Sequence, residues 1–191
     1  MKRAVFILSA FFAFVMAANA QGVTVGGTLD NFSLPDANGK TQSLNDMKGK
    51  NGAVLIFVSS QCPVVRGYNE RMNQIAADYK ARGVNVIGIN SNATETPEQI
   101  KAHADATYKF PVLIDKGNVL ADKLGANVTP EAFFFDAKNV LLYHGAIDND
   151  RSGQNVTVTY LRTAFDSALS GKKVERTSAN AFGCSIKRIG S

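Results

Sequence analysis

An apolar run that leads into a cysteine and a proline constrains the fold of this chain more than any other segment. Residues 54–58 read Val-Leu-Ile-Phe-Val, which predicts a strand buried on both faces of a sheet. Three small or polar residues, 59–61, separate this strand from Cys62 and Pro63. Proline suits the first turn of a helix, because the N–H that it lacks would have no partner there. We therefore expect a central strand to turn into a helix at Cys62.

A cysteine at a helix start is expected to be a nucleophile. The unpaired backbone N–H groups of a first turn stabilise a negative charge, so the thiol of Cys62 should ionise more readily than a free thiol. The alternative is a small, buried and inert cysteine at the end of a strand. Pro63 and the presence of a second cysteine, Cys184, favour the reactive thiol.

The first 20 residues have the pattern of a secretory signal peptide. Lys2 and Arg3 precede an apolar run, residues 4–16, and an Ala-x-Ala site ends at Ala20. An uncleaved membrane anchor is the alternative, but the run is shorter than the ~20 apolar residues of a spanning helix. We expect cleavage after Ala20, a periplasmic or secreted protein, and no membrane attachment after cleavage.

Composition narrows the possible partners. Cleavage would remove two of 21 basic residues and leave 19 against 16 acidic ones, a net charge of +3. The basic residues form no long run and do not alternate with aromatic residues, so nucleic-acid binding is not expected. The two cysteines most simply form one disulfide, structural or redox-active. With only the isolated His103 and His144 beside them, they make no zinc ligand set, and we expect no metal and no cofactor.

Periodicity and turn signals predict an α/β domain over residues 21–171 and a tail, residues 172–191, that carries Cys184. Strands and helices alternate after residue 54, which favours a parallel βαβ unit. The expected elements are a hairpin around Asn38-Gly39, a helix from Pro63 to Gly83, a strand at 84–89, a helix from Thr96, a strand at 110–115, a helix at 119–124, a hairpin of 131–136 and 140–145, and a helix at 156–169.

Several motifs occur in an order that points to a known family. They are Phe32-Ser33-Leu34-Pro35-Asp36 with Gly39-Lys40 and Ser43-Leu44, then Cys62-Pro63, Phe110-Pro111, Thr129-Pro130-Glu131, and Gly183-Cys184-Ser185-Ile186-Lys187. Over roughly residues 25–169 the chain resembles the peroxiredoxin-like (AhpC/TSA-type) redoxins. The resemblance implies a thioredoxin fold: a central mixed sheet flanked by helices, with an N-terminal β-hairpin and a C-terminal tail.

The resemblance also implies an arrangement of the site. Pro130 matches the cis-proline that faces the active cysteine in thioredoxin folds, and an ordinary trans proline at a strand start is the alternative. The backbone of Thr129 would pair with an extended peptide of a partner in β-strand fashion. Cys62 would be the catalytic nucleophile and Cys184 the resolving cysteine.

The chain departs from both parent patterns of this superfamily. Val65 occupies the position of the second cysteine in a thioredoxin Cys-x-x-Cys motif, and Ile56 occupies the position of its buried acid. In the peroxiredoxin pattern Pro-x-x-x-Thr-x-x-Cys, Ser59 can stand for the hydroxyl, whereas Leu55 replaces the proline. We find no match for the arginine that contacts peroxide.

Two charged residues are candidates for assisting the thiol. Arg66 lies one helical turn after Cys62, where it could supply positive charge or simply be solvated. Glu131 directly follows Pro130. Its carboxylate could accept a proton from a reacting thiol if burial raises its pKa, or it could reach solvent.

Three functions remain open. The favoured one is a thiol–disulfide oxidoreductase, in which Cys62 forms a mixed disulfide with a protein partner or a small thiol. The second is a thiol peroxidase, in which peroxide converts Cys62 to a sulfenic acid that Cys184 resolves. The third is a thioredoxin-fold binding module with an inert disulfide. We expect an intramolecular Cys62–Cys184 disulfide in the oxidised protein; pairing of Cys184 with another subunit is the alternative.

Overall fold

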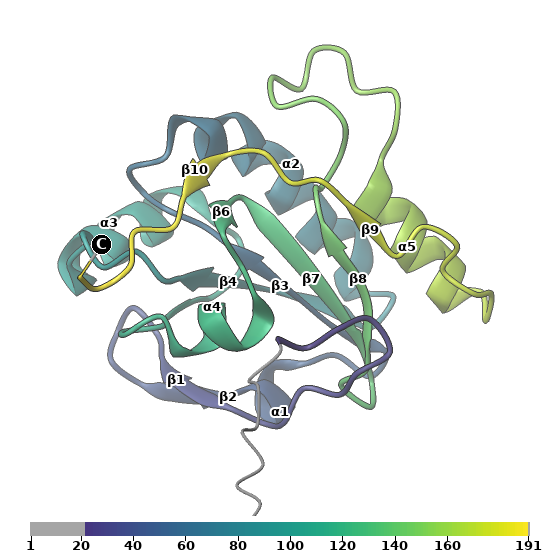
Figure 1. Ribbon diagram of the computed structural model, residues 1–191, viewed down its shortest axis with the longest axis horizontal. Helices are drawn as coiled ribbons and strands as arrows, with labels where there is room; N and C mark the ends of the chain where they lie inside the picture. The colour runs from purple at the N-terminus through teal and green to yellow at the C-terminus, as the bar shows by residue number, and fades with distance from the viewer. Residues whose placement is uncertain (1–21, 191) are drawn as a thin grey trace, which may run out of the picture.

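The computed structural model describes residues 22–190 and has an α/β fold built on a mixed sheet (Figure 1). The predicted signal peptide, residues 1–20, lies outside the described residues. The elements in chain order are β1 (Ser33–Pro35), β2 (Thr41–Ser43), α1 (Leu44–Met47), β3 (Gly52–Phe57), α2 (Pro63–Lys80), β4 (Val84–Asn90), α3 (Pro97–Thr107), β5 (Val112–Ile114), α4 (Val119–Leu124), β6 (Val128–Thr129), β7 (Glu131–Asp136), β8 (Leu141–Gly145), α5 (Tyr160–Leu169), β9 (Ser178–Ala179) and β10 (Cys184–Ser185).

The predicted central strand, β3, lies inside the sheet. One run of strands has the order β3–β7–β8–β9, with the first two pairs antiparallel and β8–β9 parallel. On the other side of β3, the Val58 N–H donates to the carbonyl of Ile89 in β4 at 2.9 Å. β4 and β5 are parallel and are joined by α3, which confirms a parallel βαβ unit. Every residue of β3 is buried.

Alternate side chains of β3 enter two apolar clusters, one on each face of the sheet. Val54 and Ile56 pack in a cluster with buried residues of α2 and α5. Leu55 and Phe57 pack in a second cluster with buried residues of α4 and with partly buried side chains of the N-terminal hairpin region. Successive side chains of a strand point to opposite faces. A strand that is covered on both sides therefore needs an apolar or small residue at every position.

The last helix and the tail differ from the sequence-based expectation. α5 begins at Tyr160 rather than at residue 156. The Asn149 side chain accepts hydrogen bonds from the N–H groups of Thr157 and Val158, at 3.0 and 2.9 Å, which holds this stretch in a loop. The tail, which showed little pattern, adds β9 to the edge of the sheet and pairs β10 with β6.

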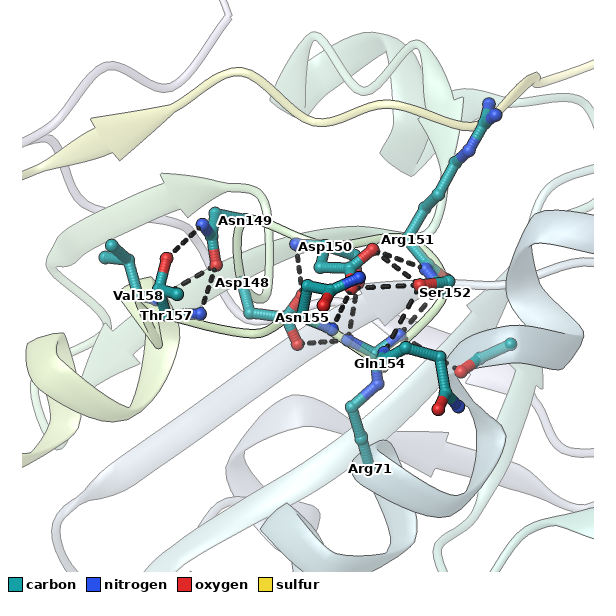
Figure 2. A network of polar contacts seen from close by, with 11 residues as sticks. Arg71, Asp148, Asn149, Asp150, Arg151, Ser152, Gln154, Asn155, Thr157 and Val158 are labelled. Carbon is teal, nitrogen blue, oxygen red and sulfur yellow. Dashed lines mark hydrogen bonds and ion pairs between the residues drawn. The ribbon is translucent and has the colours of Figure 1, made fainter.

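Arg71 of α2 holds the loop between β8 and α5 (Figure 2). Its guanidinium forms a salt bridge with Asp148 and donates to the carbonyls of Asp150 and Arg151, at 2.7 and 3.2 Å. The Asp150 carboxylate in turn accepts from the Ser152 N–H at 2.9 Å. One partly buried arginine therefore ties a polar loop to the helix that begins at Cys62.

Candidate functional site

Cys62 lies where the sequence predicts it, between the central strand and the following helix. It is the N-cap residue of α2, and Pro63 occupies the first turn. Its side chain makes no capping hydrogen bond, and the residue is only 2% exposed. The sulfur is therefore covered, and the cover decides which reagents can reach it.

The Thr129–Pro130 peptide bond is cis, as predicted. Pairing of β3 with β7 places Glu131 opposite Phe57, so the cis bond lies next to the end of the central strand. The Cys62 thiol donates to the Thr129 carbonyl at 3.3 Å. This contact brings together two site residues that lie 67 positions apart in the chain.

The tail carries Cys184 back to Cys62. β10 pairs antiparallel with β6, in a register that sets Cys184 opposite Thr129, and Figure 1 shows this yellow strand lying between α2 and β6. Both cysteines are free thiols, and the side chain of Cys184 packs against the apolar cluster that includes Cys62. Pairing of the two cysteines in an intramolecular disulfide stays a prediction, supported by the position of both beside Thr129.

The electrostatics of the pair assign the proton to Cys184. Burial raises the pKa of Cys62, but interactions of its sulfur with the Cys184 side chain, the Val65 N–H and the Thr129 side chain outweigh burial and leave this pKa below its ordinary value. Burial also raises the pKa of Cys184, and its contact with the Cys62 sulfur raises it further. Cys62 is therefore the thiol that ionises first, and an ionised thiol is the nucleophile.

Glu95 is a buried carboxylate beneath the loop that precedes Cys62. It accepts hydrogen bonds from the Ser59 hydroxyl at 2.5 Å, from the Ser60 N–H at 2.9 Å and from the Ser60 hydroxyl. Amide groups of Asn90 and Asn92 donate to it at 3.0 and 2.8 Å. These contacts fasten the loop to the end of β4. Sequence reasoning missed Glu95, because nothing local marks an acid next to a helix cap as buried.

The Ser59 hydroxyl therefore has a partner other than the sulfur. The sequence allows it to serve as the hydroxyl of a peroxiredoxin site, but its hydrogen is given to Glu95. The oxygen also accepts from the Gln61 N–H at 3.2 Å. The geometry assigns Ser59 to the support of the Cys62 loop.

Within residues 22–190, neither Arg66 nor Glu131 forms a hydrogen bond with the Cys62 sulfur. The side chain of Arg66 is exposed to solvent. The Glu131 carboxylate accepts from the N–H groups of Asn127 and Val128, at 2.9 and 3.4 Å, and so closes the turn before Pro130. A general-base role for Glu131 stays a prediction, and the structure adds a turn-stabilising role.

Tyr108 is a second residue that the sequence does not single out. Its hydroxyl is buried and has no hydrogen-bond partner among the described residues. Burial raises its pKa, and negative charge on Glu95 and on Cys62 raises it further, so the hydroxyl stays neutral.

Within residues 22–190, no group of three or more His, Cys, Asp or Glu side chains is arranged to hold a metal ion. No helix in that range is long and apolar enough to cross a bilayer.

Replacing Glu95 with glutamine is expected to lower the free energy of unfolding at neutral pH by about 2 kcal/mol, because an amide group would face donors that now point at a carboxylate. Burial raises the pKa of Glu95, but hydrogen bonds from Ser59, Ser60 and Asn92 bring it below its ordinary value of 4.5. The stability that the carboxylate contributes is therefore complete above pH 4.5 and is lost as the pH falls through the lowered pKa.

Urea unfolding of both proteins at pH 7 and at about pH 3.5 tests this expectation. The difference between them should shrink at the lower pH. The exposed Glu70 on α2 supplies the control, since Glu70→Gln should change neither value. A difference that is equally large at both pH values would contradict a role for the charged form of Glu95.

Comparison with known proteins places the chain among thiol redox proteins. Over 120 residues, which make up 62% of this chain and 68% of the relative, it is 32% identical to the thiol-disulfide oxidoreductase ResA of Bacillus anthracis. It is 33% identical over 123 residues to the thioredoxin-like protein YneN of Bacillus subtilis, covering 63% of this chain and 70% of that one.

Solved structures support the same fold over a longer range. A hypothetical protein of Sinorhizobium meliloti superposes with a TM-score of 0.80 at 36% identity, covering 90% of this chain and 98% of that one. The exposed lipoprotein thioredoxin Etrx1 of Streptococcus pneumoniae superposes with a TM-score of 0.58 at 23% identity, over 72% of this chain and 99% of that one, which shows the thioredoxin fold. The model of the AhpC/TSA family matches residues 25–144. The cis-proline near Cys62 and the mixed sheet agree with this match, and the chain belongs to the AhpC/TSA family.

Proposed function

We propose that this protein is a thiol–disulfide oxidoreductase that uses Cys62 as its nucleophile and Cys184 as its resolving cysteine. The observation that carries the proposal is the pairing of β10 with β6, which sets Cys184 opposite Thr129, the residue whose carbonyl accepts from the Cys62 thiol at the start of α2. Relatives named as thiol-disulfide oxidoreductases support this reaction class. The pattern of residues 1–20 supports export to a compartment where disulfides persist.

The proposed reaction passes through a mixed disulfide. The Cys62 thiolate attacks one sulfur of a disulfide in a partner protein, and the partner's second sulfur leaves as a thiolate that takes up a proton. Cys184 then gives up its proton and attacks the Cys62 sulfur. The partner is released as a dithiol. This chain, which has given two electrons to the partner, is left with a Cys62–Cys184 disulfide. The reverse sequence would oxidise a dithiol partner through the same intermediate.

The two steps are ordered by the charge on Cys62. Burial holds the pKa of Cys184 high, and the hydrogen bond and negative charge of Cys62 hold it higher. When Cys62 enters a mixed disulfide, its charge disappears, and with it the last two of these causes. Cys184 can then ionise and attack, so resolution follows the first attack and does not precede it.

The initial rate of reaction with a small aromatic disulfide, followed from pH 4 to pH 10 in a reduced Cys184→Ser variant, tests the proposal. Because the helix start and the Val65 N–H remain in this variant and a serine hydroxyl can donate in place of the Cys184 thiol, the rate should rise at a pH below the ~8.5 midpoint of a free cysteine and then level off. Thiolate absorbance near 240 nm should give the same midpoint. A midpoint at or above ~8.5 would instead favour an inert binding module.

Reduced protein is expected to consume hydrogen peroxide no faster than free cysteine does. The reason is that the Ser59 hydroxyl donates to Glu95 and that Arg66 is exposed, so neither group is positioned to bind peroxide at the sulfur. Stopped-flow measurement of peroxide loss, with free cysteine at the same thiolate concentration as reference, decides the point. A rate constant far above that reference would favour the peroxidase.

A further inference from the structure

The tail segment 183–187 lies on the molecule as an extended peptide would lie on a docking edge. Cys184 and Ser185 pair antiparallel with Thr129 and Val128, and the Ile186 N–H donates to the Asn127 carbonyl at 2.9 Å. Beyond them, the Lys187 N–H donates to the Asn92 side chain at 2.8 Å. Most of these contacts use backbone atoms of the tail, so a segment of another protein could make them as well.

At two positions of the segment, the site restricts which side chain fits. At Gly183, a Cβ atom would lie 1.9 Å from the Thr129 carbonyl oxygen and 2.6 Å from its carbon, so a larger residue is excluded unless the strand moves. At Ile186, the side chain is 5% exposed and belongs to the apolar cluster that also includes Leu120 and Leu124. Ser185, between them, is exposed.

We propose that segment 183–187 is an internal occupant of the partner-docking edge, and that this edge takes an extended segment of the form Gly-Cys-x-aliphatic from a partner protein. The proposal rests on the proposed function, since it names the substrate class of the same site. The residues of the bound tail indicate which partner residues would fit. The edge takes a glycine at the close approach, a cysteine beside Cys62 and an aliphatic side chain in the apolar cluster.

The internal occupant also sets the condition for reaction. Cys62 is 2% exposed while the tail is in place, so a partner must displace β10 before its disulfide reaches the sulfur. A tethered segment acts at an effective concentration of roughly millimolar, well above that of most protein partners. The tail therefore suppresses partners that do not match the edge closely.

The probes are short peptides that copy residues 182–187 and carry a thionitrobenzoate group on the cysteine. The Cys62 thiolate attacks the peptide sulfur, the bond to thionitrobenzoate breaks, and the coloured thiolate leaves as the Cys62–peptide disulfide forms. All proteins carry Cys184→Ser, which removes the resolving thiol. Adding Gly183→Ala should displace the tail through the Thr129 clash and raise the rate constant at least tenfold. Ile186→Ser, which withdraws the apolar anchor, should do the same by a separate route.

The matched control is Asn180→Ala in the same background, because Asn180 is an exposed residue of the tail outside segment 183–187. Its rate constant should be unchanged. On the tail-displaced proteins, a peptide with aspartate in place of isoleucine and one with alanine in place of glycine should each react at least tenfold more slowly than the parent peptide.

The outcomes separate this proposal from the function on which it rests. If the tail-displaced proteins react with the small aromatic disulfide and with all three peptides alike, the docking preference is wrong and the oxidoreductase proposal stands. If they react with none of these disulfides while circular dichroism shows a native fold, the oxidoreductase proposal fails. If displacing the tail leaves every rate unchanged, the tail does not cover the edge in solution.

Discussion

A Cys62→Ser variant is expected to lose thiol–disulfide exchange by roughly three orders of magnitude or more, down to the background of Cys184 alone. Serine keeps the size of the side chain, but its hydroxyl does not ionise near neutral pH and cannot form a disulfide. The rate of thionitrobenzoate release from its symmetric disulfide measures the loss. Cys184 cannot replace Cys62, because burial raises its pKa and it does not lie at a helix start.

The Cys184→Ser variant is the matched control for this loss. It should keep the first attack at a rate within a few-fold of the parent protein, because a serine hydroxyl in place of the thiol can still donate to the Cys62 sulfur. With one equivalent of reagent, it should end as a Cys62–thionitrobenzoate adduct, visible by mass spectrometry. The parent protein should end as an internal disulfide with no adduct. A parent protein that instead runs as a disulfide-linked dimer on a non-reducing gel would contradict intramolecular resolution.

Arg71→Ala is expected to lower the free energy of unfolding by about 3 kcal/mol. The side chain of Asp148 is 5% exposed, so the variant would leave a buried carboxylate without its cation. It would also remove the donors that hold the carbonyls of Asp150 and Arg151, and the guanidinium that lies 3.8 Å from the centre of the Tyr68 ring. Urea unfolding at pH 7 gives the value.

Arg82 provides a closely matched comparison. It also pairs with an aspartate, Asp166, and its guanidinium lies 4.7 Å from the centre of the Tyr79 ring. Its pair is open to solvent, with side chains 45% and 57% exposed. Arg82→Ala should therefore lower stability by less than about 1 kcal/mol. Adding Asp148→Asn to Arg71→Ala should recover part of the loss, because it removes the unpaired charge; if it recovers none, lost contacts rather than charge burial explain the effect.

Local patterns determined much of the fold. The uninterrupted apolar run of β3 predicts a strand covered on both faces, and the strand lies between β7 and β4 with both faces packed. Thr96-Pro97 predicts a helix start, and α3 begins there with the side chain of Thr96 accepting from the Gln99 N–H. Such signals can be read from sequence because caps, turns and strand periodicity depend on residues a few positions apart.

The position of Cys62 and the cis bond before Pro130 are also within reach of the sequence. The first follows from proline chemistry at a helix start, and the second from the resemblance of Thr129-Pro130 to a family motif. The start of α5 could not be predicted from the sequence, because the side chain of Asn149, outside the helix, accepts hydrogen bonds from the N–H groups of Thr157 and Val158.

Only the tertiary structure decided what surrounds the sulfur. Glu95 lies 36 positions from Ser59 in the chain, and no periodicity or motif relates them, yet the fold buries the carboxylate against the Cys62 loop. The tail has almost no apolar periodicity from which a strand could be predicted. Its strand β10 is instead held by the backbone of β6 and by the close approach that Gly183 permits. The sequence alone determined that two thiols were available and which one begins a helix. The position of both beside Thr129 depends on long-range contacts that form only when the sheet is assembled.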